Sequence, residues 1–177
     1  MTTKEMEKSI REVWDLFKAT DRQMKETDRK VAEALKAVAD LGGKWGRFVE
    51  GLVAPAAETI FKGWGIELDK VFTRVKARKN GEMMEIDILA IDGEYAVLIE
   101  VKSTLGLDNV KNHLAQLERF KTFFPEYTDR KVLGAVAGIV IDEGVDRYAY
   151  QQGLFVITQS GETVKILNDQ HFKPRTW

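Results

Sequence analysis

Cysteine is absent from this chain of 177 residues, and only two histidines and three prolines are present. The lack of cysteine excludes a disulfide framework and cysteine-ligated zinc, and two histidines are too few for a histidine-rich metal site. Any metal ion would therefore have to be held by oxygen ligands.

Long hydrophobic runs and a strong charge of one sign are also missing. No apolar run approaches the roughly 18 residues that a membrane-spanning helix needs, and the amino-terminal segment lacks the apolar core of a signal peptide. We therefore expect a soluble, cytoplasmic protein with no membrane partner. The 27 basic and 28 acidic residues leave a formal net charge of −1, so a nucleic-acid ligand would require a local basic patch.

Glycine and proline are missing from residues 2–41, and this segment carries a heptad seam. Apolar residues and threonines follow alternating spacings of three and four at Ile10, Val13, Phe17, Thr20, Met24, Thr27, Val31, Ala34, Val38 and Leu41. Charged residues fill the positions between them, which is typical of a coiled coil. We predict an amino-terminal coiled-coil domain, residues 1–41, that makes a homo-oligomer through residues 10–41, followed by a helix break at Gly42-Gly43. A single amphipathic helix folded back on its own domain is the alternative.

The segment 85–102, EIDILAIDGEYAVLIEVK, predicts a β-hairpin around Asp92-Gly93, because this dipeptide favours the type I′ turn. In that register Ile91 faces Glu94, and Asp87 and Glu100 are diagonal neighbours about 7–8 Å apart. Asp87, Glu100 and Lys102 then share one face of the hairpin. The opposite face collects only apolar residues, namely Ile86, Ile88, Ala90, Val97, Ile99 and Val101.

Two carboxylates and an amine on one strand face suggest metal-dependent phosphodiester hydrolysis. Mg²⁺ or Mn²⁺ binds to oxygen, often through only one or two carboxylates, and Asp87 and Glu100 would supply them. Lys102 could orient a water molecule or stabilise charge on a phosphate. A solvated ribbon face with cross-strand ion pairs is the plain alternative. Ala96 and Leu98 lie on the same face as the charges, which favours a covered site.

Asp87, Glu100 and Lys102 form a D-x12-E-x-K pattern that resembles the PD-(D/E)xK nuclease superfamily, which includes Holliday junction resolvases and RecB-type nucleases. The resemblance implies a restriction-endonuclease-like α/β fold over residues 44–177, with the order αβββαβ and a mixed sheet flanked by helices. It also implies a nuclease that acts on nucleic acid, with DNA favoured over RNA. No proline precedes Asp87, so the chain departs from the motif's name at that position.

Three further sets of residues are candidates for roles at the site. The first helix of the resembled fold often delivers a glutamate to the metal, and Glu50, on the helix predicted over 44–62, matches that position more closely than Glu58. A solvated helix glutamate is nearly as good a reading of Glu50. Arg74, Lys76 and Arg78 alternate along the strand predicted over 71–79, where they could contact phosphates or keep an edge strand soluble. Gln116 with Phe120 resembles the Q-x-x-x-Y element of RecB-type members, although an aromatic at this spacing is more often part of a core.

The remaining segments predict a helix over 108–124, a central strand over 131–141, a short helix over 146–152, and short strands over 154–158 and 163–167. Two other functions stay open at this point. The chain could be a catalytically inactive nuclease-fold module for nucleic-acid binding or for assembly through the coiled coil. It could also be a structural adaptor with no affinity for nucleic acid.

Overall fold

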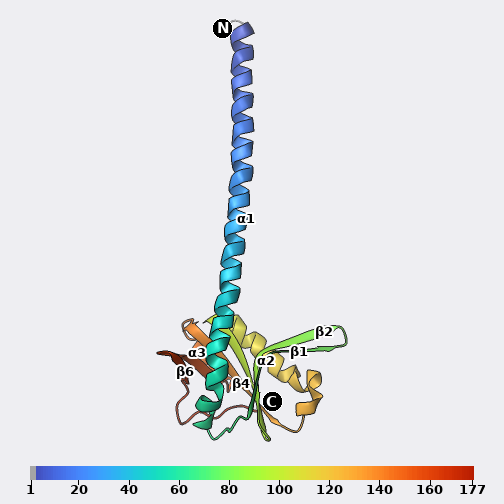
Figure 1. Ribbon diagram of the computed structural model, residues 1–177, viewed down its shortest axis with the longest axis vertical. Coiled ribbons are helices and arrows are strands. Elements are labelled where there is room, and N and C mark those ends of the chain that lie inside the picture. The colour runs from blue at the N-terminus through green and yellow to red at the C-terminus, as the bar shows by residue number, and fades with distance from the viewer. Residues whose placement is uncertain (1–2) are drawn as a thin grey trace. The chain divides into compact units, whose positions relative to one another are not determined.

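The computed structural model describes residues 3–177, apart from the side chains of Ala39, Asp40 and Trp45. Its elements, in chain order, are α1 (Thr3–Lys62), β1 (Lys70–Lys79), β2 (Glu82–Ile91), β3 (Tyr95–Leu105), α2 (Leu107–Phe123), the 3-10 turn η1 (Pro125–Tyr127), β4 (Lys131–Ile141), α3 (Val145–Gln151), β5 (Phe155–Ser160) and β6 (Thr163–Ile166) (Figure 1). In the described residues, no helix combines the length and the apolar character needed to cross a membrane.

The predicted α/β fold with a mixed sheet is confirmed. Six strands lie side by side in the order β1-β2-β3-β4-β5-β6. The pairs β3–β4 and β4–β5 are parallel, and the other three pairs are antiparallel. From residue 44 to residue 141 the elements follow the expected order of helix, three strands, helix and strand.

Two apolar clusters lie on opposite faces of this sheet. The carboxy-terminal part of α1 covers one face through Val49, Val53, Ala57 and Phe61. The helices α2 and α3 cover the other face, where Leu117 and Phe120 are buried among the strands. β4 contributes buried residues to both clusters, as expected for a strand that is covered on both sides.

The predicted helix break at Gly42-Gly43 is wrong, because α1 is helical through both glycines. Glycine inside a helix costs only about 1 kcal/mol relative to alanine and removes no backbone hydrogen bond. α1 also continues through Pro55, although proline is expensive in a helix interior. By their internal contacts, residues 1–43 and 44–177 are two compact units. The division into a coiled-coil domain, residues 1–41, and a nuclease-like domain, residues 44–177, stays a prediction.

The turn between β1 and β2 follows directly from its sequence. Asn80 and Gly81 both have positive φ, 52° and 80°, and Lys79 pairs with Glu82. These are the features of a two-residue type I′ turn, for which Asn-Gly is the preferred pair.

The register between β2 and β3 differs from the prediction by two residues. Ile91 pairs with Ala96, and Leu89 pairs with Leu98. Asp92 lies outside the turn, where its carboxylate accepts hydrogen bonds from the backbone N–H groups of Glu94 and Tyr95 at 2.6 and 2.5 Å. This Asx-type arrangement leaves Gly93 and Glu94 as the loop residues. A shift of two keeps every side chain on its face and moves Asp87 from a diagonal position to one level with Glu100.

β2 turns about its own axis at Asp87. Ile88 and Ala90 pack in the α1 cluster, whereas Met84 and Ile86 pack in the α2 cluster. In a regular strand these four side chains would share one face, so the predicted placement of Ile86 with Ile88 is wrong. The part of the β1–β2 hairpin from Val75 to Ile86, called the arm below, extends beyond the rest of the sheet (Figure 1).

Candidate active site

Asp87, Glu100 and Lys102 meet where the arm leaves the sheet. The Lys102 Nζ atom lies 2.5 Å from Glu100 Oε1 and 3.4 Å from Asp87 Oδ2. The Asp87 and Glu100 side chains are only 18% and 13% exposed. The three residues that the sequence put on one strand face therefore form a single half-buried cluster.

The end of the β2–β3 ladder explains why Asp87 turns inward. The last backbone pair of this ladder on the side of Asp87 is Ile88–Ile99. Beyond it, the backbone N–H of Val101 donates a hydrogen bond to Asp87 Oδ2 at 2.8 Å. The carboxylate takes the place of a backbone acceptor, which satisfies the N–H group and fixes the side chain.

The charges in this cluster act strongly on one another. Burial and the nearby charge of Asp87 raise the pKa of Glu100, although Lys102 opposes both effects. Burial lowers the pKa of Lys102, but its hydrogen bond to Glu100 and the charges of Glu100 and Asp87 outweigh burial and raise it overall. Lys102 is therefore a protonated amine, a donor and a positive charge rather than a base.

The atoms around Lys102 Nζ match the ligands of a hard cation. Besides the two carboxylates, the amine donates to the carbonyl oxygen of Val101 at 3.1 Å. Three oxygens thus converge on one positive charge, and oxygen ligands are what Mg²⁺ and Mn²⁺ require. A further cation beside the carboxylates would offset both the burial of Glu100 and the nearby charge of Asp87, the two main causes of its raised pKa. Asp87, Glu100 and the Val101 carbonyl fit a divalent ion, and the contribution of Val101 had no signal in the sequence because it comes from the backbone.

Glu50 is not assembled with the two carboxylates. Its Oε2 atom pairs with Arg74 Nε at 3.0 Å, and its side chain is 17% exposed. Within the part of the chain that the structure describes, no three acidic or histidine side chains are grouped to hold a metal ion. Arg74, the partner of Glu50, occupies the β1 position level with Asp87, between the pairs Thr73–Ile88 and Val75–Ile86.

Arg74 has an unusual backbone, with φ of 54°, in a strand that is otherwise regular. The left-handed region is uncommon for a residue other than glycine. Arg74 adopts it at the β1 position that is level with Asp87. The sequence contains no sign of this conformation, nor of the pair between Arg74 and Glu50.

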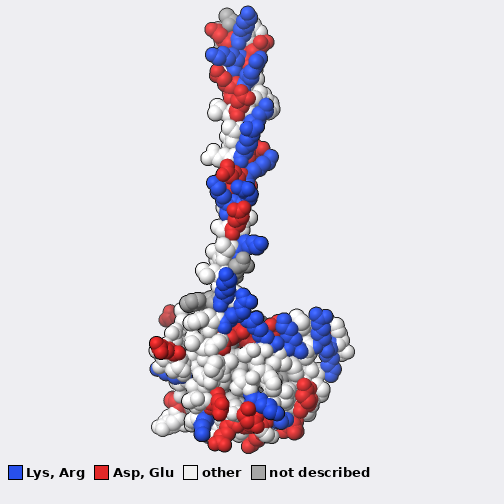
Figure 2. All heavy atoms as spheres, viewed as in Figure 1, with Lys and Arg blue, Asp and Glu red and all other residues white. Residues whose placement is uncertain are grey.

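The predicted basic stripe is exposed. Arg74, Lys76 and Arg78 are all at the surface, and Lys and Arg side chains gather on the arm in Figure 2. Lys76 pairs with Glu85 at 3.3 Å, and Lys79 reaches across to donate to the Thr122 carbonyl in α2 at 2.8 Å. Acidic partners therefore moderate part of the stripe.

Gln116 and His113 tie α2 to both strands of the site. Gln116 Nε2 donates to the Glu85 carbonyl at 3.0 Å, and Gln116 Oε1 lies 3.3 Å from His113 Nδ1. His113 Nε2 lies 3.2 Å from the Leu98 carbonyl. Burial lowers the pKa of His113 to about 4, although both hydrogen-bonding contacts oppose the shift. The imidazole is therefore neutral near pH 7, and its single N–H serves one of the two acceptors at a time.

No family model matches this sequence, and no curated protein matches it. Among solved structures, a repair endonuclease from Pyrococcus abyssi is similar, with 18% sequence identity and a TM-score of 0.40 over 59% of this chain and 45% of that one. A protein of unknown function is similar with 15% identity and a TM-score of 0.38, over 58% of this chain and 54% of that one. The chain thus spans about half the length of each protein. Both TM-scores lie below 0.5, and we draw no conclusion about this chain from either.

Proposed function

We propose that the protein is a metal-dependent nuclease that hydrolyses phosphodiester bonds of nucleic acid, with DNA favoured over RNA. The observation that carries this proposal is the convergence of Asp87, Glu100 and the Val101 carbonyl on one cationic position, at the point where the arm leaves the sheet. Acidic groups this well buried are costly unless they are compensated. Lys102 compensates part of this cost, and a divalent cation would compensate the rest.

Asp87 and Glu100, with the Val101 carbonyl, would hold Mg²⁺ or Mn²⁺ once the Lys102 ammonium moves off these three oxygens. Such an ion, when bound, lowers the pKa of a coordinated water molecule and neutralises charge on a phosphate. Lys102, whose pKa is raised, would remain protonated and would donate to a water molecule or to a phosphate oxygen. In this proposal Lys102 positions and stabilises charge, and it does not remove a proton.

The basic residues of β1 would bind the phosphate backbone. Arg74, Lys76 and Arg78 are exposed on β1, and backbone contacts of this kind supply affinity without reading sequence. The role of Glu50 as an additional metal ligand stays a prediction. It requires Glu50 to exchange its partner Arg74 for the ion.

A cleavage assay tests this function. Labelled single-stranded, duplex, flapped and four-way-junction DNA and RNA would be incubated with Mg²⁺, with Mn²⁺ or with EDTA. We expect products only with a metal ion. We expect a loss of about a hundredfold or more in Asp87→Asn and in Lys102→Met, because each removes charge from the reacting centre. Glu162→Gln is the matched control, because Glu162 is exposed in the turn between β5 and β6. Cleavage that survives in Asp87→Asn, or that is insensitive to EDTA, would refute the assignment.

We also propose that residues 10–41 join copies of the chain. The seam residues Phe17, Met24 and Val38 are more than half exposed. The hydroxyls of Thr20 and Thr27 donate to the carbonyls of Leu16 and Gln23 within the helix, both at 2.9 Å. These two polar residues can therefore lie in an apolar seam with their hydroxyls satisfied. Assembly through this seam is also the basis of the alternative function, an inactive module, which predicts oligomers without cleavage.

A further inference from the structure

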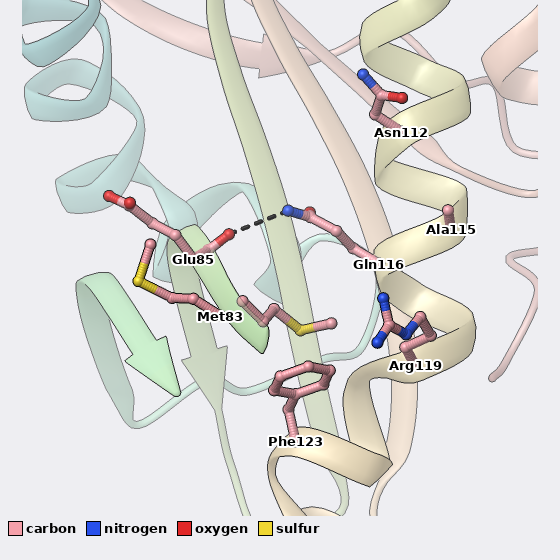
Figure 3. Close-up of a pocket in the computed structure, with 8 residues that line it drawn as sticks. Met83, Glu85, Asn112, Ala115, Gln116, Arg119 and Phe123 are labelled. Atoms are coloured by element: carbon pink, nitrogen blue, oxygen red, sulfur yellow. Dashed lines mark hydrogen bonds between the residues drawn. The ribbon is translucent and has the colours of Figure 1, made fainter. Parts of the chain in front are cut away.

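A pocket of about 190 Å³ opens between the arm and α2. Figure 3 shows Met83 and Glu85 on its strand side and Asn112, Gln116 and Arg119 on its helix side, with Phe123 at one end. None of the functions proposed above uses this pocket.

The walls of the pocket combine apolar surface with amide groups. Met83 is 55% exposed and presents its thioether to the pocket. The guanidinium of Arg119 lies over the Phe123 ring, 5.1 Å from its centre, and pairs with Glu82 at the edge of the arm. Thioether and guanidinium surfaces pack on flat heteroaromatic groups, and amides bind the polar edges of such groups.

The floor of the pocket is held in place by hydrogen bonds. Gln116 donates to the Glu85 carbonyl across the pocket, as the dashed line in Figure 3 shows. His113, which is 1% exposed, contacts the Gln116 Oε1 atom through its Nδ1 atom. Gln116 has two N–H donors, and one bond to Glu85 leaves capacity for another. The amide is thus positioned in advance for a ligand with an acceptor.

The pocket adjoins the candidate active site along the same strand. Glu85 lines the pocket and precedes Asp87 by two residues, about 6.6 Å along a strand. Lys76 and Arg78 lie on the same arm and provide positive charge for a phosphate backbone. A strand whose phosphate lies at Asp87 and Glu100 would therefore carry a neighbouring base past the pocket.

We propose that this pocket receives one unpaired nucleobase of the strand that is cleaved, so that the substrate must be single-stranded or unstacked at that nucleotide. The inference rests on the proposed nuclease function and names its substrate class. A base inside a regular duplex is stacked and paired and cannot enter a side pocket without being extruded.

Abasic substitution tests the pocket directly. A set of single-stranded DNA oligonucleotides would carry one abasic residue at each successive position around the cleaved bond. We expect wild type to cleave about tenfold more slowly when the missing base falls at one particular position, because stacking of a base on protein side chains contributes to binding. Met83→Ala and Asn112→Ala should reduce this positional contrast. Both side chains are exposed, so the variants should fold. Val140→Ala is the control, because Val140 is similarly exposed on β4.

A binding measurement separates failure of the pocket from failure of the nuclease function. Single-stranded DNA that contains 2-aminopurine would be titrated with protein in EDTA, and the fluorescence change should be weaker in Met83→Ala than in Val140→Ala. Metal-dependent cleavage that shows no dependence on the position of the abasic residue would refute base binding in the pocket. It would still support the nuclease function. If wild type cleaves nothing, the nuclease proposal fails, and the titration alone decides: equal signals from both variants would then overturn the pocket.

Discussion

Residues 3–43 and residues 44–177 use similar apolar side chains in opposite ways. In the first segment, every side chain that the structure describes is exposed, including Trp14, Phe17 and Leu35. In the second, two clusters bury the apolar residues on both faces of a sheet. An isolated helix is marginal in water and depends on packing of its apolar face. The second segment therefore contains its own stabilising contacts, whereas the apolar side chains of the first, which we propose to lie in a seam between copies, are exposed in the single chain.

The largest effect should come from placing a charge in the seam. Phe17→Asp removes an apolar side chain from each copy, which for two copies costs about 3–6 kcal/mol of association free energy. We expect sedimentation analysis to show dissociation of the oligomer. Lys18→Asp is the matched control, because it lies on the same turn outside the seam. Equal dissociation in both variants would mean that general charge, rather than the seam, controls assembly.

The corresponding change in the second segment should act on folding. Phe155 is fully buried, and the rings of Phe61, Trp64 and Phe172 lie 5.0–5.2 Å from it. Phe155→Ala should lower the free energy of unfolding by about 3–5 kcal/mol because it leaves a cavity. Chemical denaturation monitored by fluorescence would measure this. Phe17→Ala should leave the same unfolding transition unchanged, and a comparable loss there would contradict the division between the two segments.

His113 should make the second segment sensitive to acid. Its pKa of about 4 in the folded protein is below the ordinary value of 6.5, so the unfolded chain binds the proton more readily. The contribution of His113 to the free energy of unfolding is complete above pH 6.5. It is lost as the pH falls toward 4, by about 3 kcal/mol in all. Denaturation at a series of pH values should show this slope in wild type and in His171→Gln, whose histidine is exposed. In His113→Gln the free energy of unfolding should depend less on pH. An unchanged pH dependence in this variant would mean that other groups cause it.

Replacing a glycine with alanine should change stability in opposite directions in the two segments. A Cβ atom at Gly134 would lie 2.5 Å from side-chain atoms of Leu117 and Leu154, so Gly134→Ala should destabilise the second segment by about 1–3 kcal/mol. A Cβ atom at Gly42 would have no atom within 4 Å, so Gly42→Ala should stabilise α1 by roughly 1 kcal/mol. Circular dichroism during thermal unfolding would report both changes, and a shared sign would contradict this comparison.

Local sequence patterns accounted for most of the secondary structure. The period of two in residues 71–79 and the Asn80-Gly81 pair predict β1 and its turn, and both are present. Two local predictions were wrong, for different physical reasons. Asp92 was expected to be one of the two loop residues of the hairpin. It instead precedes the loop, and its carboxylate accepts hydrogen bonds from the N–H groups of Glu94 and Tyr95. Gly42 and Gly43 were expected to end a helix, although glycine only weakens one.

The candidate site was partly predictable for the same reason. A two-residue period places Asp87, Glu100 and Lys102 on one face in either register, so their meeting does not depend on the exact pairing. The amino-acid sequence therefore determined the elements, their order and the charged face on which this cluster lies, because these depend on local periodicity. Tertiary structure alone decided four features. These are the change of face in β2 at Asp87, the pairing of Glu50 with Arg74, the contacts of the Val101 N–H and carbonyl groups with Asp87 and Lys102, and the pocket beside α2. Each of these depends on contacts between segments far apart in the chain, and on backbone groups that carry no signature of residue type.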